Sequence, residues 1–125
     1  MKYLLDVSTI VALLWKEHAD HSKTRAWAAG KKLAVCPFTE LGFLRVVTSP
    51  ACNATMTDAR EVLEIFLAEE KPEFIPADIR ALQGEAPPSS SKTTDWYLAN
   101  LARAHGMNWA TLDTRASHPA RTLVA

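Results

Sequence analysis

The sequence predicts an α/β protein of three layers, a sandwich in which helices cover both faces of a mainly parallel sheet of four to five strands. Short apolar runs alternate with longer segments of helical periodicity, the pattern of parallel strands joined by helices. The runs are apolar throughout, as in strands buried on both faces. No internal repeat divides the 125 residues, so we expect a single domain over 1–125.

The chain is expected to begin with a strand and two helices. Residues 3–5 form a short apolar run, and the Asp that follows ends the strand. Ser8 or Thr9 is then expected to cap a short helix, because both side chains can accept a hydrogen bond from the backbone N–H groups of a first turn. A turn at 16–20 precedes a second helix. Gly30 is the residue type that commonly closes a helix.

The middle of the chain repeats this order. Residues 33–36 form a second short strand, which Pro37 stops. Residues 38–40 open a third helix with apolar residues at helical spacing, and the Thr-Ser-Pro sequence at 48–50 ends it. After a loop, Thr57 is expected to cap a fourth helix whose acidic positions form a solvated outer face.

The last part contains the most irregular stretch. Residues 73–75 predict a brief third strand, and Asp78 is expected to cap a short helical piece through residue 82. Residues 84–91, rich in Pro, Ser and Gly, predict a surface loop. Thr93 or Thr94 is expected to cap a fifth helix. The remaining predicted features are the end of that helix at His105-Gly106 and two strands, at 108–112 and 121–124.

Composition excludes several classes of protein. The formal net charge is zero, so there is no overall basic signal for nucleic acid. Bases are more frequent in the first third and acids between residues 58 and 78, which allows a basic rim around an acidic pocket. No run reaches the ~20 apolar residues of a membrane helix, and no signal peptide is recognisable, so we expect a cytoplasmic protein. Cys36 and Cys52 are expected to be reduced.

Four carboxylates stand out by their position. Asp6 and Asp113 each end a predicted strand, whereas Glu40 and Asp95 lie in the first turn of a helix. All four would project from one edge of a parallel sheet, where they would repel one another. Oxygen ligands of this kind suit Mg²⁺ or Mn²⁺, and no His or Cys beside them indicates zinc. Each acid alone also has a structural explanation, as a helix-dipole partner or a turn residue.

Such a metal site has a defined chemistry. A bound divalent cation polarises a phosphodiester and lowers the pKa of a water molecule that attacks it. A carboxylate that does not bind the metal can then act as the general base.

The four acids lie in segments that resemble the motifs of PIN-domain ribonucleases, most closely those of the VapC-type toxins of bacterial toxin–antitoxin pairs. The resemblance extends over the whole chain in the family's order. It implies a metal-dependent endoribonuclease acting on tRNA, ribosomal RNA or mRNA, an antitoxin partner and a homodimer. It also implies that Asp6, Glu40, Asp95 and Asp113 are both catalytic and ligands of Mg²⁺ or Mn²⁺. The matching segments are Leu4-Leu5-Asp6-Val7-Ser8, Thr39-Glu40-Leu41-Gly42-Phe43-Leu44-Arg45, Thr94-Asp95-Trp96-Tyr97-Leu98-Ala99 and Ala110-Thr111-Leu112-Asp113.

Some residues near these motifs are open to two interpretations. Ser8 stands where many family members carry Asn, and it could hold a water molecule at the metal. Arg45 matches an arginine of the second motif, and either contacts RNA phosphate or the antitoxin, or pairs with a nearby acid. Lys92 either contacts phosphate or is a solvated lysine. Trp96 and Trp109 either stack on bases or pack in the core.

Other functions fit the sequence less well. A receiver-like domain also gathers acids at strand ends, but it would need an acidic pair after the first strand, where only Asp6 is present. A catalytically inactive PIN scaffold that binds RNA or a protein is the main alternative. His18 and His21 are spaced to share a metal, yet no third ligand is evident and surface histidines are the simpler interpretation. No glycine-rich loop indicates a nucleotide cofactor.

Overall fold

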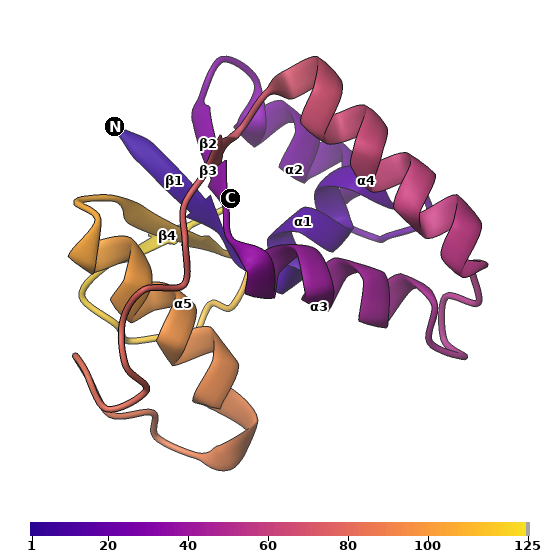
Figure 1. Cartoon of the computed structure of the whole chain (residues 1–125). Helices are drawn as coiled ribbons and strands as arrows, with labels where there is room; N and C mark the ends of the chain where they lie inside the picture. Colours follow the sequence, from indigo (N-terminus) through magenta and orange to yellow (C-terminus); the bar gives the residue numbers. More distant parts are fainter. Residues whose placement is uncertain (125) are drawn as a thin grey trace.

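The strands form one sheet in which every neighbouring pair is parallel. In this computed structural model, which describes residues 1–124, the strand order is β3-β2-β1-β4-β5 (Figure 1). The fold class predicted from the sequence is therefore confirmed, and the strands lie within one residue of their predicted positions. Their bounds are β1 Lys2–Leu5, β2 Lys32–Val35, β3 Glu73–Phe74, β4 Asn108–Thr111 and β5 Arg121–Leu123.

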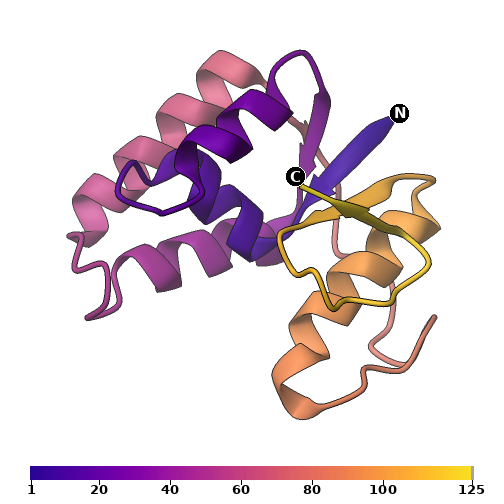
Figure 2. The same cartoon turned by 180° about the vertical axis from the view of Figure 1, so that it is seen from behind.

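Helices cover both faces of the sheet. Four of them lie on one face and α5 lies on the other, which gives three layers (Figures 1 and 2). A single 3₁₀ turn, Ser90–Lys92, leads directly into α5. The α-helices are α1 Val7–Leu14, α2 His21–Ala28, α3 Pro37–Val47, α4 Met56–Glu70 and α5 Thr93–Ala104. None of the helices in the described part of the chain is long and apolar enough to cross a membrane.

The core consists of two clusters, one on each face of the sheet. Because successive side chains of a strand point to opposite faces, Leu4 and Trp109 pack with α5, whereas Leu5 and Ala110 pack with α1, α3 and α4. All four side chains are fully buried. The continuous apolar composition of the predicted strands follows from this double coverage.

The strand order changes direction at β1. The chain moves from β1 outward to β2 and β3, with its helices on one face, and then returns by α5 across the other face to β4. Crossover connections between parallel strands are right-handed, so a chain that reverses its direction along the sheet must place the next helix on the other face. The carboxyl ends of β1 and β4 therefore lie at a topological switch point, which is where open α/β sheets bind ligands. Asp6 follows β1, and Asp113 lies two residues after β4.

The expected caps of α1 are wrong, because Asp6 itself begins the helix. Its side chain accepts a hydrogen bond from the N–H of Val7 at 2.8 Å, and the helix starts at Val7. The N–H of Asp6 donates to the carbonyl oxygen of Ala110 at 3.0 Å, so the residue is still tied to β4 when the helix begins. Ser8 and Thr9 consequently lie within the first turn, and the Thr9 hydroxyl donates to Ala110 instead.

The expected cap of α4 is also misplaced by two residues. Thr55, and not Thr57, precedes the helix, and its hydroxyl accepts from the N–H of Asp58 at 3.0 Å. Both threonines have the right chemistry. Thr55 has the extended backbone of a capping residue, with ψ of 154°, and this conformation directs its hydroxyl to the N–H groups of the first turn.

Two expectations in the second half of the chain are wrong as well. Residues 78–82 form no helix, and the Asp78 carboxylate instead contacts Nε2 of His105 at 2.8 Å. Thr93 and Thr94 lie inside α5, because the preceding 3₁₀ turn places Lys92 at the capping position. The predicted helix ends are confirmed at Gly30 and Gly106, where φ values of 76° and 69° favour glycine.

Candidate active site

Asp6 is the best-fixed carboxylate of the predicted site. It lies at the end of β1, and its residue is only 2% exposed. One oxygen accepts from the N–H of Val7, and the other accepts from the hydroxyls of Ser8, at 3.1 Å, and Thr111, at 2.8 Å. These hydrogen bonds fix the orientation of the Asp6 carboxylate. They also offset part of the free-energy cost of burying its charge.

Burial and a neighbouring charge perturb the acidity of this carboxyl. Burial is the main cause that raises the pKa of Asp6 from 3.8 to about 6, and the negative charge of Asp95 raises it further. The hydrogen bonds from Thr111, Val7 and Ser8 oppose this change without cancelling it. Burial also raises the pKa of Asp95, and the charge of Lys92 opposes that rise. Asp6 and Asp95 therefore form a pair in which full ionisation is disfavoured.

Asp113 differs from this pair because a lysine neutralises it. Nζ of Lys92 donates to Oδ2 of Asp113 at 2.9 Å, and the N–H of Arg115 donates to Oδ1 at 2.9 Å. The hydrogen bond from Lys92 is the main cause that lowers the pKa of Asp113. Asp113 also raises the pKa of Asp95, so the three aspartates act on one another electrostatically through Asp95.

Thr111 links two of the predicted site residues and was missed by sequence reasoning. Its buried hydroxyl donates to Asp6 and accepts from the N–H of Asp113 at 3.1 Å. It is the last residue of β4 and follows the apolar pair Trp109 and Ala110. That polar residue at a strand end was the available signal, but the sequence does not show that β4 lies beside β1.

Glu40 lies in the first turn of α3, and neighbouring contacts bring this turn close to Asp6. The Thr39 hydroxyl donates to the carbonyl oxygen of Leu5 at 2.9 Å, which ties α3 to the residue before Asp6. Burial raises the pKa of Glu40, and none of the aspartates contributes to this rise. Glu40 therefore stands at the edge of the cluster rather than in its electrostatic centre.

The donor set fits a divalent cation, although the side chains are not yet gathered around one point. Within residues 1–124, no three His, Cys, Asp or Glu side chains already converge as a metal site. Asp113 is paired with Lys92, and the charge of Asp95 opposes the ionisation of Asp6. A divalent cation bound among these oxygens would favour their ionised forms, and so oppose the burial and charge repulsion that raise the pKa values of Asp6 and Asp95. Oxygen donors alone favour a hard ion such as Mg²⁺ or Mn²⁺.

The two predicted accessory residues differ in their surroundings. Ser8 is exposed and bonded to Asp6, so it lies at the site. Arg45 is exposed in the last turn of α3, and within residues 1–124 it forms no ion pair with an acid. Pairing with a nearby acid therefore does not account for Arg45, and its contact with RNA or a partner stays a prediction.

The aromatic and histidine candidates are structural. Trp96 and Trp109 are buried and meet each other edge to face, with ring centroids 6.1 Å apart, so the core interpretation is confirmed. His18 accepts a hydrogen bond from the N–H of Asp20, and the His21 ring bonds the carbonyl oxygen of Ala12. The two histidines are half-buried and contact the backbone, rather than being the surface histidines that the simpler interpretation predicted. Cys36 and Cys52 are free, as expected.

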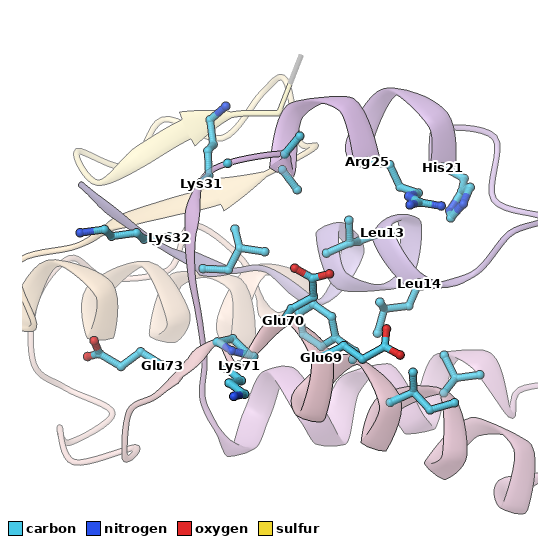
Figure 3. Close-up of a pocket in the computed structure, with 18 of the residues that line it drawn as sticks. Leu13, Leu14, His21, Arg25, Lys31, Lys32, Glu69, Glu70, Lys71 and Glu73 are labelled. Atoms are coloured by element: carbon cyan, nitrogen blue, oxygen red, sulfur yellow. The ribbon is translucent and has the colours of Figure 1, made fainter.

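A large groove lies on the α1–α4 side of the sheet, away from the carboxylates. Its volume is about 1040 Å³, and it includes Lys2, Lys32 and Glu73 at the starts of β1, β2 and β3 (Figure 3). Its apolar lining comes mainly from α1 and α4, with Leu33 of β2. Most bases of the first third of the chain line this groove, whereas Lys23 does not. The principal groups are apolar Leu13, Leu14, Val62, Ile65 and Phe66, basic Lys16, Arg25, Lys31, Lys32 and Lys71, and acidic Glu69 and Glu70.

Comparisons with known proteins agree on one family. The PIN domain matches residues 3–122. Ribonuclease VapC38 of Mycobacterium tuberculosis is 35% identical over 118 residues, which cover 88% of this chain and 84% of that protein. Ribonuclease VapC44 of the same organism is 32% identical over 123 residues, with coverages of 90% and 87%.

A solved structure shows the same fold. The chain resembles the crystal structure of VapBC2 from Rickettsia felis bound to a DNA fragment from their promoter, with a TM-score of 0.64. The similarity covers 98% of this chain and 97% of that one, at 17% sequence identity.

Proposed function

Because the chain belongs to the PIN-domain family, we propose that it is a divalent-metal-dependent endoribonuclease and the toxin of a toxin–antitoxin pair. The observation that carries this proposal is the buried carboxyl of Asp6, whose pKa is about 6 and whose ionisation Asp95 opposes. A fold does not gather mutually repelling acids at a switch point for stability. Two named ribonucleases among the relatives support the substrate class.

We propose that Asp6, Asp95 and Asp113 hold one or more Mg²⁺ or Mn²⁺ ions, and that Glu40, at the edge of this group, stays free of the metal. The bound cation supplies Lewis acidity to the phosphodiester and lowers the pKa of the attacking water. Ser8 and Thr111 orient the Asp6 carboxylate through their hydroxyls, and Thr111 also bonds the backbone at Asp113. This network keeps two acids from separate strands in a fixed relation.

Glu40 is the candidate acceptor for the proton that the attacking water loses. Its pKa is raised by burial, and it stands outside the electrostatic group of the three aspartates. A carboxyl with a raised pKa accepts a proton more readily than an ordinary one does. We therefore assign to Glu40 the removal of the proton from the attacking water.

The test of the proposed function is cleavage of total cellular RNA by the purified chain, freed of any bound partner. We expect discrete fragments with Mg²⁺ or Mn²⁺ and none with EDTA, because the acids alone cannot activate water for attack on a phosphodiester. Cleavage that is unchanged in EDTA would contradict the metal site. A folded protein that leaves RNA intact with every metal would favour the inactive scaffold.

We propose that the cognate antitoxin occupies the groove beside α4. The groove combines an apolar floor with more basic than acidic side chains. Figure 3 shows Arg25 on the same side as Leu13 and Leu14, and Lys31 and Lys32 pointing outward at the opposite end. This combination suits an amphipathic helix with acidic residues along the edge of its apolar face. Inhibition would then begin at a surface that is separate from the carboxylates.

Replacing Ile65 with aspartate is expected to weaken antitoxin binding by about a hundredfold and to leave RNA cleavage unchanged. Ile65 lines the groove and is 49% exposed, so a charge there disturbs the partner more than the fold. Met56→Asp is the matched control, because Met56 is equally exposed on α4 and does not line the groove. Titration of a labelled antitoxin measures both variants. Equal affinity of both variants would exclude the groove.

We also propose that the chain forms a homodimer through α3. Phe38 and Leu41 are 42% and 61% exposed there, although both are large apolar side chains on one helix. Burial of these side chains against a second copy would stabilise the pair. The mass of the purified chain in solution, measured by light scattering, tests this proposal.

A further inference from the structure

Lys92 occupies a position where helix stability alone disfavours a lysine. It stands at the capping position of α5, and its side chain makes no capping bond. Ser, Thr, Asp and Asn are preferred there, and a cation is unfavourable at the positive end of the helix dipole. Serines and threonines flank it on both sides, so a better cap was one residue away. A residue that breaks a local rule in this way indicates a functional role.

The contact made by Lys92 points to that role. Its ammonium lies 2.9 Å from Oδ2 of Asp113, and the backbone N–H of Arg115 engages the other oxygen. Both oxygens of Asp113 are therefore occupied by donors. The same ammonium lowers the pKa of Asp95, which places its charge close to a second site residue. The only other described lysine–aspartate pair, Lys23–Asp20, joins α2 to the residue before it and is longer, at 3.8 Å.

We propose that Lys92 is a built-in competitor for the divalent cation, which neutralises Asp113 in the metal-free protein and must leave that carboxylate when the cation binds. This inference rests on the proposed metal site. It explains why the side chains are not gathered around one point, since one of the acids is already paired. Lys92 thereby lowers the affinity of the chain for divalent metal.

The size of the effect follows from two contributions. A divalent cation that takes Asp113 breaks a partly exposed ion pair, and the released ammonium then repels the cation across the site. Both contributions disappear when the charge of Lys92 is removed. Together they predict a roughly tenfold gain in metal affinity.

The experiment is direct titration of the full chain with Mn²⁺ in the absence of RNA, by calorimetry. We expect Lys92→Met to bind Mn²⁺ roughly tenfold more tightly than the natural chain, and Lys92→Arg to bind it with the natural affinity because the charge remains. Lys23→Met is the matched control, since it removes an equal charge from a surface ion pair with an aspartate. Lys92→Asn provides a second neutral variant, because asparagine is a good helix cap.

The outcomes separate this inference from the proposed function. Equal or weaker Mn²⁺ binding by both neutral variants, with binding by the natural chain intact, would overturn the role of Lys92 and leave the metal site standing. Failure of every variant and of the natural chain to bind Mn²⁺ would overturn both. A gain seen equally with Lys23→Met would assign the effect to net charge and would also overturn the inference.

Discussion

Replacing Asp6 with asparagine is expected to abolish RNA cleavage and to stabilise the metal-free fold above pH 6. Loss of a charged ligand at the centre of the site should reduce the rate by about a thousandfold or more. Asparagine can still accept the hydrogen bond from Val7, so the start of α1 is preserved. Activity and stability should therefore change in opposite directions.

The stability gain follows from the sign of the pKa shift. The pKa of Asp6 is raised from 3.8 to about 6, so the folded chain binds this proton more tightly than the unfolded chain does. Ionisation consequently destabilises the fold as pH rises from about 4 to 6, and the full cost of roughly 2–3 kcal/mol is present above that range. Asparagine cannot ionise and avoids this cost.

Thermal melting in EDTA at several pH values measures the effect. We expect Asp6→Asn to melt several degrees above the natural chain at pH 8, and at nearly the same temperature at pH 4. Asp20→Asn, at the half-exposed residue directly before α2, is the control for loss of one negative charge. A lower melting temperature for Asp6→Asn at pH 8 would show that the ionised carboxylate stabilises the fold, contrary to this account.

Replacing Gly42 with alanine is expected to destabilise the fold by about 1–3 kcal/mol and to reduce cleavage by about a hundredfold. A Cβ at Gly42 would lie 2.3 Å from Cγ2 of Val7 and 2.9 Å from Cγ1. Val7 directly follows Asp6, and Glu40 lies two residues before Gly42. Separation of α1 from α3 would therefore move Asp6, a proposed metal ligand, away from Glu40, the proposed proton acceptor.

The direction of this change is diagnostic, because alanine normally stabilises a helix by about 1 kcal/mol relative to glycine. Chemical denaturation of Gly42→Ala, Val7→Ala and the double variant measures the interaction. Removal of the Val7 methyls takes away the two closest contacts, so the double variant should recover part of the stability lost in Gly42→Ala. Gly42→Ala as stable as the natural chain would contradict the close packing of these helices.

The sequence predicted the elements well and their caps poorly. Apolar runs and helical periodicity placed every strand, because they reflect burial on two faces of a sheet. Asp6, Ser8 and Thr9 are all suitable caps for α1, and the choice depends on the hydrogen bond from Asp6 to Ala110 in another strand. Such a bond between distant segments leaves no trace in local composition.

The candidate site was likewise predicted only in part. Position at strand ends and in first turns singled out Asp6, Glu40, Asp95 and Asp113 as candidates, and the structure brings the three aspartates into electrostatic contact. The hydroxyl of Thr111 was not recognisable, and Lys92 was considered only as a phosphate contact or a solvated lysine. The contacts of these two residues with Asp6 and Asp113 depend on β4 lying beside β1 and on the path of the loop before α5.

The chemistry of the RNA ends tests whether a carboxylate-held metal directs water onto the phosphodiester. The fragments made by the purified chain in Mg²⁺ are analysed for their terminal groups, with Asp95→Asn as the blank. Attack by water predicts linear monophosphate ends, and none of these fragments with Asp95→Asn. Cyclic 2′,3′-phosphate ends would instead identify the RNA 2′-hydroxyl as the nucleophile and would contradict the account.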